Sequence, residues 1–334
     1  MKKLIALILS IVSALTVFTF SACGDARADV NVEYYPDASA LLTALKEDDI
    51  AFGVLAEPAA SNLEKMTKDT KTWYRLDIQE LYDAETKSYP QAVMFVKESV
   101  LNTYPQLLTT IESKFADNTA WVAENAAQAI NKINEVFLPA GNTSTLKPAM
   151  LNASVIDNCK IYWQSADSAK TAVKNYLNSI IAIEKISATA ATDDLFYNGM
   201  ATGNFTADTI KVYAPDGAPA LAIAKFINDN ESFNTGKTFE YHVVNANQIN
   251  DNVEEGSGDI VILPVNAASK LYKKFNADPY KLVSVITHGN LYLMCSEHIT
   301  ANDLKDKTVG MFGHGNVPDL TFQVVLDKLG YKIK

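Results

Sequence analysis

The sequence predicts an α/β protein with mostly parallel sheets, and three features indicate it. From Asp208 onward, short apolar runs typical of strands alternate with amphipathic helical patterns. The segment GDIVILPV, residues 258–265, is almost entirely apolar, which suits a strand that is buried on both faces of a sheet. The length of 334 residues leaves room for two such cores.

The second half of the chain follows a regular order. Asp216-Gly217 marks a turn after the first strand, and Pro219 suits the first turn of the helix that follows. The segment 280–297 is an unusually long extended stretch broken at Gly289-Asn290, so it is predicted to leave one sheet and enter another. The expected strands are 210–215, 239–246, 258–265 and 308–313, and the expected helices are 218–229, 248–256 and 317–330.

The first half supplies further elements of both kinds. In the helix expected over 165–186, apolar residues recur at helical spacing, and this face is predicted to lie in the core rather than to bind a partner. The expected strands or extended segments are 30–35, 50–58, 74–82 and 89–97, and the expected helices are 37–49, 59–66, 103–125, 126–137 and 165–186.

The chain ends on a helix, a glycine turn and the start of a strand, YKIK. A helix of an α/β unit buries its apolar face against a sheet, so a further strand is needed. Residues 30–35 begin with such a strand, and joining Lys334 to Asp29 produces an uninterrupted series of helices and strands. We therefore expect the two chain ends to lie side by side.

The N-terminus predicts a secretory signal peptide over residues 1–22. Lys2 and Lys3 precede an apolar run, and small residues stand before Cys23. A transmembrane anchor is the alternative, but the run is short for a span and contains Ser and Thr. The tetrapeptide 20–23, FSAC, resembles the bacterial lipobox, which implies cleavage before Cys23 and lipidation of its sulfur.

The net charge argues against one class of partner, and the sequence context of the cysteines argues against a disulfide. Loss of Lys2 and Lys3 changes the formal net charge from −10 to −12, which argues against nucleic acid as a partner. Cys159 and Cys295 lie in apolar segments, and two unpaired buried thiols are favoured over a disulfide.

Five segments together resemble the solute-binding proteins of bacterial ABC importers, of the type II branch that includes nitrate, sulfonate, taurine and thiamine-precursor binders. They are KVYAPDGAPALAIAKF, GDIVILPVNAASKLYKK, DLKDKTVGMFGHGNVPD, ALKEDDIAFGVLAEPAAS and SYPQAVMFVK. In that family the KVYAPDG segment lies near the mature N-terminus, so this chain is predicted to be circularly permuted, with 198–209 as the bridge between the old ends. A gene or assembly accident is the alternative.

The resemblance implies a two-lobe, periplasmic-binding-protein-like α/β fold with hinge crossing strands. One lobe would combine residues 89–200 with 208–293, and the second 30–88 with 294–334. The chain would be a monomer that captures a small solute between the lobes and delivers it to an ABC permease. It would stand outside the cytoplasm, lipid-anchored to the outer face of the cytoplasmic membrane or free in the periplasm.

Ligands of open α/β sheets bind at the carboxyl ends of the strands, beside helix N-termini. The glycines among the candidates either let the backbone approach a ligand or simply form tight turns. The predicted ligand-binding residues are Glu57, Gln91, Asp216, Gly217, Ala218, Asn266, Asn290, Gly313, His314, Gly315 and Asn316.

No enzyme or cofactor is expected. The motifs GxSxG, HExxH, CxxC and the P-loop are absent, and GHGNVP has Pro318 where a dinucleotide fingerprint needs its third glycine. His288, His314 and Glu57 could together bind a metal, but the resemblance favours organic or small inorganic solutes. The alternatives are an enzyme of the thiamine-pyrimidine synthesis type and a non-functional rearranged surface lipoprotein.

Only Arg27 and Arg75 are arginines, so an arginine clamp on an anion has at most one candidate in the mature core. The expected solute classes are nitrate, sulfonate, bicarbonate and pyrimidine or thiamine-precursor compounds. The residue supply slightly favours a neutral or weakly cationic heterocycle stacked on a tyrosine.

Overall fold

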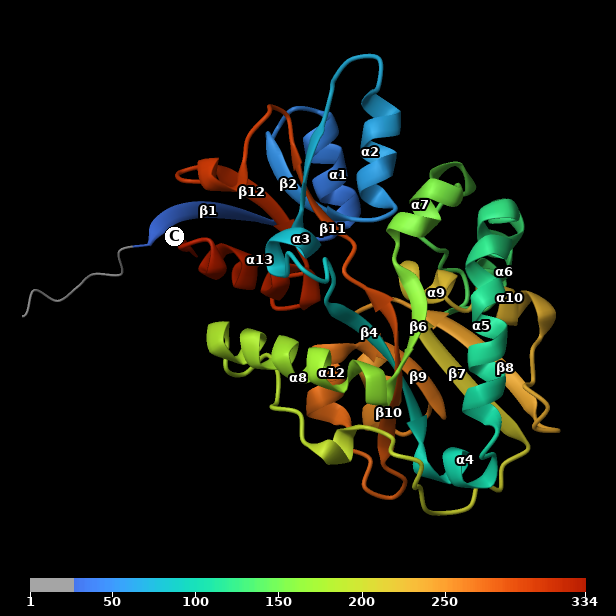
Figure 1. Ribbon diagram of the computed structural model, residues 1–334. Coiled ribbons are helices and arrows are strands. Elements are labelled where there is room, and N and C mark those ends of the chain that lie inside the picture. Colours follow the sequence, from blue (N-terminus) through green and yellow to red (C-terminus); the bar gives the residue numbers. More distant parts are fainter. Residues whose placement is uncertain (1–26) are drawn as a thin grey trace, which may run out of the picture.

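The computed structural model describes residues 27–334 and contains two sheets, one above the other in Figure 1. The predicted signal peptide and Cys23 lie outside the described residues. The six-stranded sheet has the order β13-β1-β12-β2-β11-β3. Its strands are β1 (Ala28–Tyr35), β2 (Phe52–Ala56), β3 (Tyr74–Asp77), β11 (Leu291–Cys295), β12 (Thr308–Phe312) and β13 (Tyr331–Ile333).

The seven-stranded sheet has the order β5-β8-β7-β9-β4-β10-β6. Four of its strands, β5, β8, β7 and β9, run parallel to one another. The strands are β4 (Pro90–Lys97), β5 (Phe137–Leu138), β6 (Ile161–Ser165), β7 (Thr209–Pro215), β8 (Thr238–Val244), β9 (Ile260–Pro264) and β10 (Tyr280–His288).

Each sheet contains one antiparallel strand that the chain brings from the other sheet. The chain leaves β3, passes through α3 (Ile78–Tyr82) and enters the seven-stranded sheet as β4, antiparallel to β9 and β10. It returns from β10 to β11, which is antiparallel to β2 and β3. The two sheets therefore share one internal pattern: β1-β12-β2-β11-β3 corresponds to β8-β7-β9-β4-β10.

Helices cover both faces of each sheet (Figure 1). Around the six-stranded sheet, α1 (Ala38–Lys46) and α2 (Ala59–Thr67) pack on one side and α13 (Val317–Lys328) on the other. The other helices are α4 (Glu98–Thr103), α5 (Leu107–Glu124), α6 (Ala126–Glu135), α7 (Ala153–Asn158), α8 (Ala166–Ile183), α9 (Ala218–Leu221), α10 (Ala224–Asp229), α11 (Ile249–Glu254) and α12 (Val265–Leu271), with short 3-10 turns at η1 (Pro148–Met150), η2 (Asp193–Leu195) and η3 (Ala301–Asp303).

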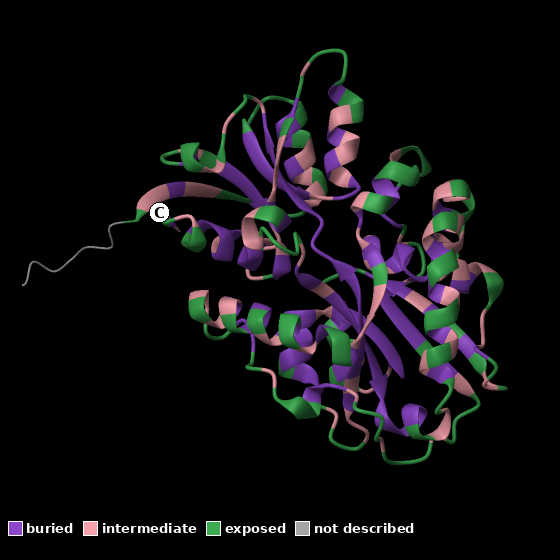
Figure 2. Cartoon of the chain, in the orientation of Figure 1, coloured by how far each residue is buried: buried purple, intermediate pink, exposed green. Residues whose placement is uncertain are grey.

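The predicted α/β class with two lobes of mostly parallel sheets is confirmed. The central strands of the two sheets, β2, β11, β9, β4 and β10, are buried along most of their length (Figure 2). Two local predictions were wrong. Residues 78–82 are helical rather than extended because the Asp77 carboxylate accepts a hydrogen bond from the Glu80 amide and caps a helix. The single helix expected over 218–229 is broken between α9 and α10.

The two chain ends pair with each other. Val30 of β1 lies opposite Ile333 of β13, and the Lys334 amide donates to the Val30 carbonyl at 3.1 Å. The second half of β1 pairs in parallel with β12. Strands from opposite ends of the chain thus lie side by side in one sheet, as the sequence predicted.

The two lobes are in contact at the side of α8. Its residue Tyr176 is fully buried and lies 2.5 Å from Thr321 of α13, hydroxyl to hydroxyl. The ring of Tyr82 in α3 lies edge-on to Tyr176 at a centroid distance of 5.6 Å. The predicted core face of this helix is confirmed, and α8 joins the two sheets into one core.

Because β13 closes the sheet, Tyr331→Ala is expected to destabilise the whole protein. The Tyr331 side chain is 6% exposed and its hydroxyl donates to the Asn302 carbonyl at 2.7 Å. Loss of a buried aromatic side chain costs about 3 kcal/mol, measured as the free energy of unfolding in urea. The control, Tyr74→Ala, removes a ring that is 39% exposed and should cost less than about 1 kcal/mol. Equal costs for the two variants would contradict the closing role of β13.

Candidate functional site

The strand ends of the two lobes meet at the crossing segments, and there the structure brings two predicted residues together. Glu57 follows β2, and Asn290 stands between β10 and β11. The Glu57 amide donates to the Asn290 carbonyl at 3.0 Å, and both residues are buried. Gly289 beside them must lack a side chain, because a Cβ would lie 2.3 Å from the Tyr89 ring.

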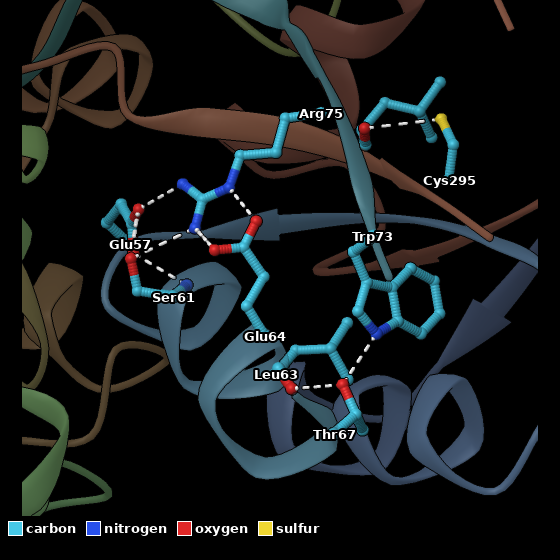
Figure 3. A network of polar contacts seen from close by, with 9 residues as sticks. Glu57, Ser61, Leu63, Glu64, Thr67, Trp73, Arg75 and Cys295 are labelled. Carbon is cyan, nitrogen blue, oxygen red and sulfur yellow. Dashed lines mark hydrogen bonds and ion pairs between the residues drawn. The ribbon is translucent and has the colours of Figure 1, made fainter. Parts of the chain in front are cut away.

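Glu57 belongs to an ion cluster with Glu64 and Arg75 (Figure 3). Arg75 Nη1 lies 2.6 Å from Glu57 Oε1, while Nε and Nη2 bind the two oxygens of Glu64 at 2.6 and 2.7 Å. Burial alone lowers the pKa of Arg75, but the hydrogen bonds and charges of Glu64 and Glu57 outweigh it and raise this pKa. Arg75 therefore stays positively charged between the side chains of Glu57 and Glu64.

The side chain of Glu57 also caps helix α2. Its Oε2 accepts from the Ser61 amide at 3.1 Å and its Oε1 from the Ser61 hydroxyl at 2.8 Å. The carboxylate thus satisfies a free N–H group of the first helical turn. Burial, followed by the charge of Glu57, raises the pKa of Cys159 in the other lobe.

The predicted group 313–316 lies in the same lobe and directly precedes α13. The buried carboxylate of Asp319 accepts from the Gly315 amide at 2.8 Å and the Tyr34 hydroxyl at 3.1 Å, and His314 Nδ1 lies 3.1 Å from it. Asn316 is exposed. Burial, followed by the charge of Asp319, raises the pKa of Tyr34. An internal carboxylate therefore occupies the N-terminus of α13.

In the seven-stranded lobe, Asp216 binds a neighbouring loop. Its carboxylate accepts from the Ser144 hydroxyl at 2.5 Å and from the Thr145 amide and hydroxyl, both at 2.8 Å. Gly217 follows with φ 103°, a left-handed turn conformation, and Ala218 begins α9. Asp216 thus holds the loop after β5, which reaches the other lobe where Lys65 Nζ donates to the Ala149 carbonyl at 2.7 Å.

Asn266 uses its amide within its own lobe. Its Nδ2 donates to the Ser187 carbonyl at 3.2 Å, and the residue is 6% exposed in α12. Three predicted residues therefore lie near the crossings: Glu57 and Asn290, which are hydrogen-bonded to each other, and Gln91 of β4. Residues 216–218, Asn266 and residues 313–316 make their contacts elsewhere.

Unpartnered polar atoms gather at the crossing segments. Six buried side-chain N or O atoms lack a hydrogen-bond partner among the described residues, and four of them belong to Gln79, Tyr89, Gln91 and Asn290. A dehydrated polar group without a partner costs about 1–3 kcal/mol. Sequence reasoning missed Gln79, whose Oε1 accepts from the Leu291 amide at 2.8 Å, because its segment was expected to be extended.

His288 lies beside these residues and stacks on Tyr162, with a centroid distance of 3.6 Å. Its Nε2 is 3.2 Å from Gln164 Oε1. Burial lowers the pKa of His288 to about 4. The ring is therefore neutral at pH 7 and acts as a packed hydrogen-bonding group.

Cavities lie on the surface around the two lobes. A hollow of about 480 Å³ is lined by α5, α7 and Tyr162, and another of about 440 Å³ lies beside α8. Neither is lined by residues 216–218 or 313–316. The prediction of unpaired buried thiols is confirmed for Cys159 and Cys295.

Residues 27–334 contain no cluster of three or more His, Cys, Asp or Glu side chains arranged to hold a metal ion. Within the same range, no helix combines the length and apolarity that a bilayer span requires.

Comparisons with known proteins add little. No family model matches the chain, and no curated protein matches it. Among solved structures, NikA from Brucella suis in complex with Fe(III)-EDTA is similar over 80% of this chain and 57% of that chain, at 11% identity and a TM-score of 0.29. So low a score carries no argument.

The fold assignment rests instead on strand order. Two mostly parallel sheets repeat one order and exchange one antiparallel strand each. The fold consists of two α/β lobes whose sheets share one strand order, joined by two crossing segments.

The buried neutral His288 predicts a specific loss of stability in acid. The unfolded pKa is about 6.5, so the stabilisation is present above that pH and is lost as pH falls toward 4. A shift of this size corresponds to about 3 kcal/mol. Urea unfolding at pH 7 and at pH 4.5 should therefore show a smaller stability difference for His288→Gln than for the unchanged chain. His298→Gln, at an exposed position, should leave the difference unchanged, and the same result for His288→Gln would refute the assignment.

Proposed function

We propose that this protein is the extracytoplasmic solute-binding component of an ABC importer. The observation that carries the proposal is the pair of crossing segments between two lobes of the same strand order, where the unpartnered atoms of Gln79, Tyr89, Gln91 and Asn290 lie. Separation of the lobes would let water reach these atoms, whereas a solute held between the lobes favours closure. Such differential stabilisation of two states is how a ligand shifts an equilibrium.

The lobe division follows the same segments. We keep the predicted division into 89–200 plus 208–293 and 30–88 plus 294–334, with one change: all of β11 (Leu291–Cys295) goes to the second lobe, because it pairs with β2. Residues 198–209 form the bridge between the proposed ancestral ends. Pairing of β13 with β1 supports a circular permutation, because it makes a continuous sheet from the two chain ends. In a chain assembled by accident from unrelated gene fragments, the two ends would not be expected to pair in one sheet.

The remaining assignments rest on the sequence. Cys23 would carry lipid on the outer face of the cytoplasmic membrane, and the monomer would deliver its solute to a permease. The solute would belong to the nitrate, sulfonate, bicarbonate or pyrimidine and thiamine-precursor classes of the resembling branch. The proposed ligand-binding residues are Glu57, Gln91 and Asn290 at the crossings, together with residues 216–218, Asn266 and residues 313–316.

An enzyme of the pyrimidine-synthesis type has less support. The two thiols are buried, and burial raises the pKa of Cys295 to about 12, so neither is a ready nucleophile. His288 is packed against Tyr162. The proposed function therefore involves binding alone.

Thermal unfolding of the chain without residues 1–22 and with Cys23→Ser tests the proposal. One cooperative transition is expected, raised by several degrees by one solute class at a concentration of about 100 Kd, which corresponds to about 2.7 kcal/mol. A cooperative melt that no solute raises would favour an inert lipoprotein. A chain with no cooperative melt would indicate a broken gene.

A further inference from the structure

The charges around the crossing segments indicate which solute the proposed site can accept. The arginine side chains are all paired. Arg27 is ion-paired with Asp327, beside β13. Arg75 directs Nε, Nη1 and Nη2 at the carboxylates of Glu57 and Glu64 and at the Ser61 hydroxyl. Both arginines therefore already pair with carboxylates.

Lysines near the site also have partners. Lys65 Nζ donates to the Ala149 carbonyl, and Lys160 lies 3.9 Å from Asp157. These are exposed or half-buried groups whose charges are screened by water. They leave the buried part of the site without an unpaired positive charge among the described residues.

Helix N-termini are the other anion-binding groups of α/β folds. Those of α1, α2 and α13 each hold a carboxylate of this chain: Asp37 accepts from the Ser39 and Ala40 amides, Glu57 from Ser61, and Asp319 from Gly315. In the other lobe, α9 has four residues, α11 six and α12 seven, so none has a developed macrodipole. An anionic solute would compete with built-in carboxylates.

The four unpartnered atoms at the crossings comprise two acceptors, one donor (Gln79 Nε2) and the Tyr89 hydroxyl, which can donate or accept. Asn290 is 1% exposed, and its Oδ1 has no donor, although the residue is bonded through its backbone to Glu57. Gln91 Oε1 on the adjacent strand also lacks a donor. In the ion cluster two carboxylates face one guanidinium, and each carboxylate oxygen can accept more than one hydrogen bond.

We infer that the solute is an organic cation with N–H groups, held where Asn290 adjoins the ion cluster of Glu57, Glu64 and Arg75. Its positive charge balances the second carboxylate, and its N–H groups provide the donors that Asn290 and Gln91 lack. This inference rests on the proposed solute-binding function. It selects against nitrate, sulfonates and bicarbonate.

Binding measured by thermal shift and calorimetry at low salt tests the charge. The cationic probes are benzamidine, putrescine and spermidine, and the anionic probes are benzoate, ethanesulfonate, nitrate and bicarbonate. Benzamidine and benzoate have similar shapes and opposite charges. At least one cation is expected to raise the melting temperature, and no anion should do so.

Variants locate the response. Glu64→Gln removes one negative charge at a side chain that is 39% exposed and should weaken binding of the active cation about tenfold. Glu47→Gln, an exposed position of the same lobe, should leave the affinity unchanged. In the double variant Glu57→Gln and Glu64→Gln, Arg75 loses both counter-charges, so nitrate or benzoate is expected to gain affinity.

The outcomes separate the two proposals. A response of the unchanged chain to an anion overturns the charge assignment and leaves solute binding intact. Unchanged cation affinity in Glu64→Gln overturns the location. A cooperative melt that no probe of either charge shifts overturns both the charge assignment and the binding function.

Discussion

The parallel pairing of β1 with β12 and β13 is the constraint on which the remaining structure depends. It joins the first and the last residues of the described chain in one sheet, with Val30 opposite Ile333. Without β1 the six-stranded sheet would lose the strand that lies between β13 and β12, and α13 would cover an incomplete surface. Because β2 adjoins both β12 and β11, the same pairing positions Glu57 against the crossing segment.

The crossings link this lobe to the other. They combine packing between the lobes with buried polar side chains that lack hydrogen-bond partners. Contacts of Tyr176 with Tyr82 and Thr321 hold the lobes together, while Gln79, Gln91 and Asn290 carry buried polar atoms without partners. The packing favours contact between the lobes, and the buried polar atoms without partners favour their separation. A ligand bound at the crossings can therefore shift the equilibrium between the two states. The ion cluster adds a charge preference, since Arg75 is matched by two carboxylates.

Sequence reasoning predicted the strand and helix series and the adjacency of the ends, because apolar periodicity and the incomplete final unit are local signals. It identified Glu57, Gln91 and Asn290 as candidates because each stands at a strand end. It could not foresee that Asp216 would bind the loop at Ser144, or that Asp319 would occupy the N-terminus of α13, because side-chain pairing depends on tertiary distances. The helix at 78–82 was not predicted, because the sequence pattern indicated a strand while the Asp77 carboxylate caps a helix there.

A rearranged chain tests the central claim most directly. A gene that joins Lys334 to Ala28 through a short glycine-serine linker and opens the chain within residues 198–209 would restore the proposed ancestral order. Since the ends already pair, this variant is predicted to melt cooperatively within a few degrees of the original and to bind the same solute. A variant that fails to fold while the original chain folds would contradict the account.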